Sequence, residues 1–278
     1  MTATDSLLAS VPHSPSSGIK ALARFGFAAK GVVYILMGLL ALLAATGQSG
    51  GQTADKKQAV QTLQDLPGGQ VLLGLMALGL LGYIVWRFTQ AVRDTESKGS
   101  GAKGIGRRIG YAGSGLLYAG VAWYAAQLAF SGSADSGGGG STQQTLTAKV
   151  LSWPAGDWII IAIGLITIGS GIYQIYRAYS GSFHKHVDSS DLPDAQRNTV
   201  YRTGQIGYTA RGIVMGIIGY FFVQAGRQSR AAAVGTTDEA FDLLATMGPP
   251  VLGIVALGLM AYGLYMLVQA RYPVLNGV

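Results

Sequence analysis

Six apolar runs of membrane-spanning length dominate the chain. Each run is bounded by Gly, Pro or charged residues, and each is close to the ~20 residues that a helix needs to cross ~30 Å of hydrocarbon. Lipid leaves an unpaired backbone N–H or C=O unsatisfied, and the runs lack the ~10-residue alternation of barrel strands, so we expect helices. The runs cover about residues 22–46, 69–91, 108–130, 156–179, 205–226 and 249–271.

The composition agrees with an all-α integral membrane protein. Only 12% of the residues are charged and 49% are apolar, whereas a soluble domain carries roughly 25% charged residues. The absence of Cys excludes disulfides, thiolate catalysis and Cys-ligated metals. Residues 1–18 contain no apolar stretch, which predicts a disordered cytoplasmic tail and no cleaved signal peptide.

The basic residues are distributed unequally between the two ends of the spans. One side holds Lys20, Arg24, Lys30, Arg87, Arg93, Lys98, Lys103, Arg107, Arg108, Arg177, Lys185, Arg197, Arg202, Arg211 and Arg271, and the other side holds Lys56, Lys57, Lys149, Arg227 and Arg230. Basic loops resist translocation. We therefore predict a multi-pass membrane protein with cytoplasmic N- and C-termini. The net charge of +7 reflects this topology, and we expect no nucleic-acid partner.

An internal repeat connects the first, third and fifth runs. The three copies read RFGFAAKGVVYILMG from Arg24, RIGYAGSGLLYAGVA from Arg108 and QIGYTARGIVMGIIG from Gln205. The even-numbered runs share another pattern, a Gly followed by two aromatic residues: Gly79, Tyr83 and Trp86, then Gly169, Tyr173 and Tyr176, then Gly258, Tyr262 and Tyr265. The repeating unit is therefore a two-helix hairpin.

All three hairpins enter the membrane from the same side, so the repeats are parallel. We predict hairpins at 22–91, 108–179 and 205–272 around a pseudo-threefold axis, joined by cytoplasmic linkers at 92–107 and 180–204. Within each hairpin a short segment with helical apolar spacing precedes a Pro, at 58–67, 146–154 and 239–249. These segments predict interfacial helices, which are either connectors or a lid and docking surface.

These motifs resemble the bacterial membrane family called domain of unknown function 1206, over roughly residues 22–272. The threefold hairpin is the most specific part of the resemblance. The third copy departs from it, since Gln205 replaces the opening Arg and Met215 replaces the Tyr. The resemblance implies six helices and a location in the bacterial cytoplasmic (inner) membrane, and it supplies no reaction and no catalytic residues.

Small residues recur along one face of the odd-numbered helices. Lipid gives helices little hydrophobic reason to associate, so small side chains that allow close backbone approach are favoured at contacts. We interpret the stripe as helix packing, with a permeation pathway as the alternative. Its members are Gly31, Gly38, Gly115, Ala122, Gly212 and Gly219.

Aromatic residues also recur, and their hydroxyl groups need partners. We expect interhelical hydrogen bonds or anchoring at the membrane interface, with ligand contact as the alternative. The repeated positions are Tyr34, Tyr118, Tyr83, Tyr173 and Tyr262.

Two cations occupy equivalent repeat positions inside the spans, Lys30 and Arg211. Each lies about six residues, or ~9 Å, beyond the first residue of its motif. They either clamp an anionic headgroup between helices or snorkel to the cytoplasmic headgroups. With Arg24 and Arg108 they are the candidate contacts for an anionic lipid or ligand, and Ser114 interrupts the ring of charge at the third position.

No Asp, Glu or His lies near the middle of any span, so a proton relay, a carboxylate cation site and bis-His haem lack their ligands. We therefore expect no cofactor, no metal and no enzymatic activity. The sequence favours a scaffold or accessory subunit that binds another membrane protein, membrane lipids or itself as a homo-oligomer. A small-solute or ion channel or transporter is the alternative.

Overall fold

The structure is a computed structural model that describes residues 17–47, 64, 69–93, 101–131, 142–187 and 193–274. Most of its described residues are helical, and their only β contact is an isolated bridge between Val187 and Pro273. The predicted all-α fold is thus confirmed over the described part of the chain. The predicted tail lies outside it, apart from Ser17 and Gly18.

Five helices are long and apolar enough to cross a membrane. They are α2 (Ser17–Ala45), α4 (Gly69–Arg93), α7 (Gly156–Tyr179), α8 (Asp194–Gln228) and α10 (Pro249–Arg271). The apolar stretches coincide with five of the six predicted spans. For α7 and α10 the observed helix has the predicted bounds. The backbone just before Gly156 and just before Pro249 is not helical, so neither helix can begin earlier.

The sixth expected span is α5 (Ala102–Ser131), a helix of 30 residues that is not among those five. Arg107 and Arg108 occupy its first turns, and Gly, Ser and Tyr lower its hydropathy. Residues 109–131 nevertheless contain no Asp, Glu, Lys or Arg. At 1.5 Å per residue this uncharged part is ~34 Å long, enough to cross the hydrocarbon core.

Three helices extend beyond the predicted spans at their basic ends. α2 begins at Ser17, α5 at Ala102 and α8 at Asp194, so parts of the predicted linkers 92–107 and 180–204 are helical. Hydropathy marks where a helix meets lipid, but a helix can continue into water as long as its residues tolerate helical geometry. For α8, Pro193 at the N-cap position sets the actual start.

Short helices lie at the opposite ends of the long ones. They are α6 (Thr142–Leu151), which packs on α7, and α9 (Thr237–Thr246), which packs on α8 and α10. A capping box between Thr236 and Glu239 starts α9, and Gly248, with a φ of +116°, ends the turn into α10. Two predicted interfacial segments are thus helical, and the third, 58–67, is outside the described residues except for Gln64.

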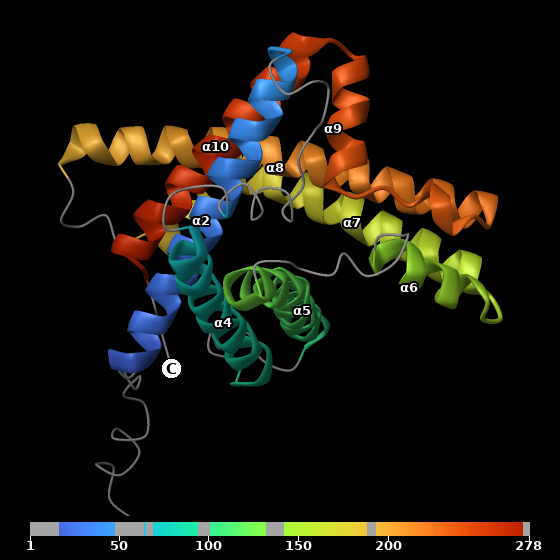
Figure 1. Ribbon diagram of the computed structural model, residues 1–278, viewed down its shortest axis with the longest axis horizontal. Helices are drawn as coiled ribbons and strands as arrows, with labels where there is room; N and C mark the ends of the chain where they lie inside the picture. Colours follow the sequence, from blue (N-terminus) through green and yellow to red (C-terminus); the bar gives the residue numbers. More distant parts are fainter. Residues whose placement is uncertain are drawn as a thin grey trace, which may run out of the picture.

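The long helices pack in an open row whose order is α5, α4, α2, α10, α8 and α7 (Figure 1). In this row, the first helix of each repeat (α2, α5 or α8) packs on the second helix of another repeat. The pairs are α2 with α10, α5 with α4, and α8 with α7. The two helices of one repeat also meet in α2 with α4 and in α8 with α10. The two helices of the second repeat, α5 and α7, share no comparable interface.

Glycines allow the tightest of these contacts. A Cβ at Gly31 would lie 2.8 Å from the carbonyl oxygen of Gly263, and one at Gly212 would lie 2.8 Å from that of Gly171. Gly38 and Gly219 repeat the pattern further along α2 and α8, against backbone carbonyls of α10 and α7. A Cβ at Gly115 would lie 3.3 Å from the Phe88 ring. Ala122 is the buried small residue that follows Gly115 on α5.

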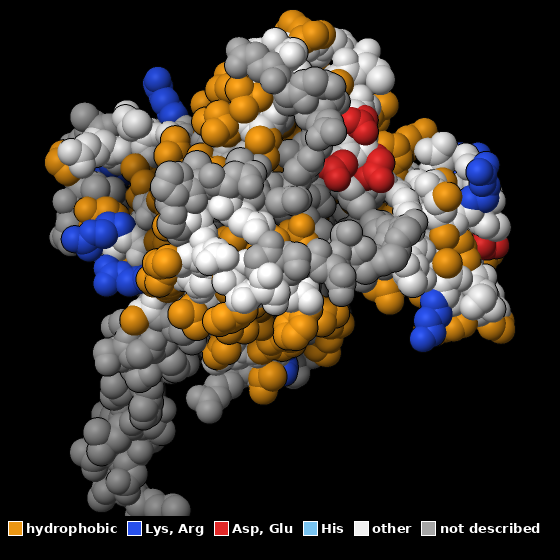
Figure 2. Space-filling model, viewed as in Figure 1, with side chains coloured by type: hydrophobic (Ala, Val, Ile, Leu, Met, Phe, Trp, Pro, Cys, Tyr) orange, Lys and Arg blue, Asp and Glu red, His pale blue; other side chains and the backbone are white. Residues whose placement is uncertain are grey.

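Large apolar side chains also cover the outside of the molecule. Figure 2 shows them gathered over α4 and α5 and around α2 and α10, while the Lys and Arg groups lie toward the ends of the molecule. Leu116, Phe130, Trp158, Ile166 and Ile254 are each at least two-thirds exposed. A surface of this kind is stable in lipid rather than in water.

Candidate functional site

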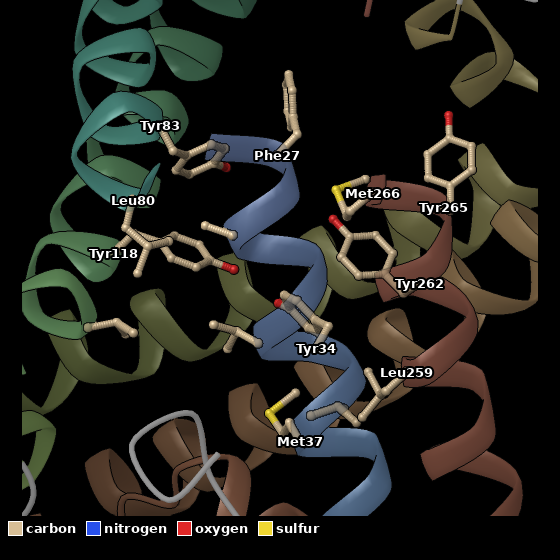
Figure 3. Packing of buried hydrophobic residues seen from close by; sticks show 14 of the residues in the cluster. Phe27, Tyr34, Met37, Leu80, Tyr83, Tyr118, Leu259, Tyr262, Tyr265 and Met266 are labelled. Carbon is tan, nitrogen blue, oxygen red and sulfur yellow. The ribbon is translucent and has the colours of Figure 1, made fainter. Parts of the chain in front are cut away.

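Lys30 lies buried at the centre of the row of helices, with 3% of its surface exposed. Its Nζ donates a hydrogen bond of 3.3 Å to the Tyr83 hydroxyl. The Nζ also lies 5.1–6.0 Å from the ring centroids of Tyr34, Tyr83, Tyr118 and Tyr262, within reach of cation–π attraction. Figure 3 shows these four rings, from α2, α4, α5 and α10, turned toward one central space.

Arg211 reaches the same centre from α8. Its Nε donates to the Tyr34 hydroxyl at 3.1 Å, and its Nη1 donates to Gln174 Oε1 at 2.7 Å and to the Tyr262 hydroxyl at 3.1 Å. Gln174 in turn donates from Nε2 to Met215 Sδ. Arg211 is therefore held by groups from α2, α7 and α10, and its side chain points into the protein.

Arg87 is a third cation at this centre. Its Nε donates to the Tyr83 hydroxyl at 2.8 Å and its Nη1 donates to Gln90 Oε1 at 2.8 Å. The Tyr83 hydroxyl also lies 3.2 Å from Ser114 Oγ. We call the group formed by Lys30, Arg87, Arg211 and Gln174 with the four central tyrosines the central cluster.

The three cations are linked through shared tyrosines. Lys30 and Arg87 contact Tyr83, while Lys30 and Arg211 contact Tyr34 and Tyr262. The six predicted spans contain no Glu, and Asp157 is their only Asp. The Asp157 carbonyl contacts Gly226, which is about 20 Å along α8 from Gly212. Among the described residues, no carboxylate therefore lies in the central cluster.

The arrangement therefore concentrates positive charge in an apolar setting without a matching negative charge. Hydroxyl oxygens and ring faces stabilise each cation, but neither reduces the mutual repulsion of three like charges. An anion placed among them would stabilise each cation and would also reduce the repulsion among the three. Among the described residues, no group of three or more His, Cys, Asp or Glu side chains is arranged to hold a metal ion.

The snorkelling alternative for Lys30 and Arg211 is wrong, because both side chains turn toward the centre instead of toward the headgroups. Arg24 and Arg108 are not part of the central cluster. Arg24 donates to the carbonyl oxygens of Ala270 and Arg271 at the end of α10, and Arg108 donates to those of Ala91 and Val92 at the end of α4. Each Arg thus caps the C-terminus of a neighbouring helix, where positive charge is favourable.

Tyr173 does not join the other repeated aromatic residues. Tyr83 and Tyr262 are 0% and 1% exposed, whereas Tyr173 is 49% exposed and stacks on Tyr176. The glycine contacts give the reason. Gly263 of α10 contacts Gly31, and Gly171 of α7 contacts Gly212, which is the equivalent of Gly31. Gly171 is therefore equivalent to Gly263, and the residue before it, Ser170, is equivalent to Tyr262 and to Tyr83. The predicted alignment of α7 was therefore wrong by three residues, close to one helical turn.

Two cluster residues were missed by the sequence analysis, Arg87 and Gln174. Arg87 was counted only as a basic residue near the end of a span. It does lie one turn after Tyr83 on an otherwise apolar helix, and this spacing places both side chains on one helix face. Gln174 takes the place of Arg87 in the corrected register of α7.

The family described as Domain of Unknown Function (DUF1206) matches the chain three times, over residues 25–94, 109–181 and 206–273. The chain belongs to the DUF1206 family. It is also 33% identical over 274 residues to "Uncharacterized protein YxxB" of Bacillus subtilis (strain 168), covering 98% of both chains. No solved structure matches it significantly.

Every residue of the central cluster lies inside one of the three DUF1206 segments, and the segments contribute unequally. The first supplies two cations, the third supplies one and the second supplies none. The helix-capping residues Arg24 and Arg108 each lie immediately before a DUF1206 segment. The centre is therefore a shared feature of all three repeats, made asymmetric by the residue at each equivalent position.

Proposed function

We propose that this protein acts by binding rather than catalysis, and that its central cluster binds an anionic group, either a lipid headgroup or a small phosphate-type anion. The cluster of Lys30, Arg87 and Arg211 without a carboxylate is the observation that carries the proposal. Removing a charge from water costs several kcal/mol. Cations retained inside a membrane protein are for this reason functional candidates.

The proposed setting is the bacterial cytoplasmic membrane, crossed six times with both termini in the cytoplasm. Three hairpins surround a pseudo-threefold axis, and the central cluster lies on that axis. The excess of basic residues at one end of the spans supports this orientation. The matching glycine contacts of the α2 with α10 pair and of the α8 with α7 pair support the axis.

Binding fits the geometry of the centre better than conduction does. Four tyrosine rings pack around Lys30, whereas a pore needs a continuous path with polar groups at several depths. The same site makes the protein an accessory subunit or scaffold for anionic lipid, and the apolar outer faces of its helices are available to another membrane protein or to a second copy.

The test uses the full-length protein in lipid nanodiscs. Binding is measured with inorganic phosphate in zwitterionic nanodiscs, and separately by comparing phosphatidylglycerol with phosphatidylcholine as the added lipid. Lys30→Met and Arg211→Met each remove one charge, and Arg230→Gln is the matched control because Arg230 is exposed and outside the cluster. A hydrogen bond to a charged group contributes about 1.5–3 kcal/mol, so each cluster variant should bind about tenfold or more weakly.

Saturable binding in one arm identifies the source of the anion, phosphate in solution or the lipid headgroup. Equal binding by the wild type, Lys30→Met and Arg230→Gln would contradict the proposal. Anion flux through liposomes that requires Lys30 and Arg211 would instead establish the channel alternative.

A further inference from the structure

Two of the three repeats bring their own helices together through the same contact. In the first repeat, a Cβ at Gly26 of α2 would lie 2.6 Å from Tyr83 Cβ on α4. Beside it, Gly79 of α4 fits against the Ala29 side chain, because a Cβ at Gly79 would lie 2.9 Å from that of Ala29. The two backbones therefore touch at the level of the central cluster.

The third repeat makes this contact again. A Cβ at Gly207 of α8 would lie 2.5 Å from the Tyr262 backbone on α10, and Gly258 fits against Ala210. The pairs Gly26 with Tyr83 and Gly207 with Tyr262 are equivalent in the repeat, as are Ala29 with Gly79 and Ala210 with Gly258. A contact formed twice at equivalent positions is a property of the repeat unit.

In the second repeat the equivalent faces exist but do not meet. Gly110 and Gly113 of α5 occupy the positions of Gly26 and Ala29, and a Cβ on either would contact nothing within 4 Å. On α7 the corrected register places Ser170 and Ile166 at the positions of Tyr83 and Gly79. Ile166 is 71% exposed.

The two open faces are complementary in volume. The formed contacts pair an Ala on the first helix of the repeat with a Gly on the second helix, in Ala29 with Gly79 and in Ala210 with Gly258. In the second repeat the first helix, α5, has Gly113, with no side chain, and the second helix, α7, has the larger Ile166. If the two helices met, the extra volume on α7 would fill the missing volume on α5, as close packing requires.

We propose that α5 docks on α7 of the same chain, with Gly110 against Ser170 and Gly113 against Ile166, and that this contact closes the open row into a ring of long helices. The occupant is the chain's own α7 because the other two repeats join their own two helices in this way. Tethering within one chain also favours this contact over binding of a second copy, by raising the effective concentration. The ring encloses the central cluster, whatever that cluster binds.

Closure supplies the side of the centre that the row leaves open. In the ring, Ser170 takes the place that Tyr83 has on α4 and Tyr262 has on α10. Tyr118 of α5 and Gln174 of α7 already reach the cluster from the two ends of the row. Their helices therefore need only approach each other along faces that now meet lipid.

Disulfide cross-linking in lipid bilayers tests the proposal, and the chain is suited to it because it contains no Cys. The test variant is Gly113→Cys with Ile166→Cys. The positive control is Ala45→Cys with Gly253→Cys, whose Cβ atoms would be 3.8 Å apart across the formed contact of α2 with α10, the usual separation in a disulfide. The negative control is Phe130→Cys with Ile166→Cys, since Phe130 lies about 25 Å along α5 from Gly113.

We expect the test variant to form an intramolecular disulfide to the same extent as the positive control, and the negative control to form none. A second pair, Ile109→Cys with Ile166→Cys, corresponds to the contact of Phe25 with Gly79 and replaces the first if that variant gives no folded protein. Disulfide-linked dimers would show that a second copy occupies the face. Absence of cross-linking in both pairs, with the positive control oxidised, would also overturn the proposal.

Discussion

The central tyrosines combine two kinds of interaction with the cations. Their ring faces attract Lys30 and Arg211, while the hydroxyl oxygens of Tyr34, Tyr83 and Tyr262 accept hydrogen bonds from the three cations. A cation–π contact contributes about 0.5–2 kcal/mol, comparable to a hydrogen bond to a charged group. These contacts hold the cations in place, but because the tyrosines are neutral they do not cancel the repulsion among the cations.

At single residues, the close helix contacts predict a sharp difference between two glycines on α8. A Cβ at Gly219 would lie 2.8 Å from the Gly164 carbonyl oxygen and 2.7 Å from the Ile168 side chain, whereas one at Gly216 would contact nothing within 4 Å. We expect Gly219→Ala to lower the free energy of unfolding by about 1–3 kcal/mol through overpacking, and Gly216→Ala to leave it unchanged or raise it by up to about 1 kcal/mol, because Ala is the better helix former. Thermal unfolding in detergent measures both, and equal midpoints would contradict the packing account.

Helix ends explain several residues that otherwise look like ligand contacts. Arg24 and Arg108 satisfy carbonyl oxygens at the ends of α10 and α4. Because the last four carbonyls of a helix lack intrahelical partners, a capping Arg joins neighbouring helices as well as balancing the helix dipole. At the third position Gln205 has no charge, so this device operates in two of the three repeats.

At the scale of one element, the capping box of α9 predicts a measurable loss. Thr236 Oγ1 accepts from the Asp238 backbone N–H, and Glu239 Oε2 accepts from the Thr236 backbone N–H. We expect Thr236→Ala to reduce the free energy of unfolding by about 1 kcal/mol. Thr246→Ala is the control, because Thr246 Oγ1 donates to the Leu243 carbonyl at the exposed end of the same helix. Chemical denaturation that does not separate the two variants would contradict this role for the cap.

In the whole molecule, the first helix of each repeat has its closest partner in another repeat. The α2 with α10 pair and the α8 with α7 pair repeat the same glycine contacts, and α5 lies on α4 in the corresponding place. A fold built in this way depends on all three repeats, because no hairpin contains its own closest pair. We infer that the repeats stabilise one another and that a single hairpin would lack much of its packing.

Whether α5 crosses the membrane decides the topology of everything after it. If it does, Ser152 lies outside the cytoplasm and Asn198 lies inside; if it does not, both positions are reversed. We expect Ser152→Cys to react with an impermeant maleimide added outside cells, and Asn198→Cys to react only after lysis. Both side chains are exposed, so access to the reagent is controlled by the membrane. The reversed labelling pattern would contradict a six-span topology.

The sequence alone determined the long apolar helices and the repeat, because lipid requires long apolar helices and because copied hairpins retain their Gly and Tyr spacing. It also identified Lys30 and Arg211 as equivalent cations, and four of the five repeated tyrosines meet beside them in the structure. Composition and periodicity are local properties, so they can be read from the sequence without knowing which helices are neighbours.

Tertiary structure decided which helices are neighbours and which side chains therefore meet. Arg87 joins the cluster only because α4 packs on α2. Gln174 joins it because the glycines of α7 fix a register that its tyrosines do not reveal. Arg24 and Arg108 lie outside the cluster and cap helices instead, because α10 and α4 end beside them. Each of these outcomes depends on contacts between residues distant in the sequence, and the close fit of backbones at particular glycines is what selects them.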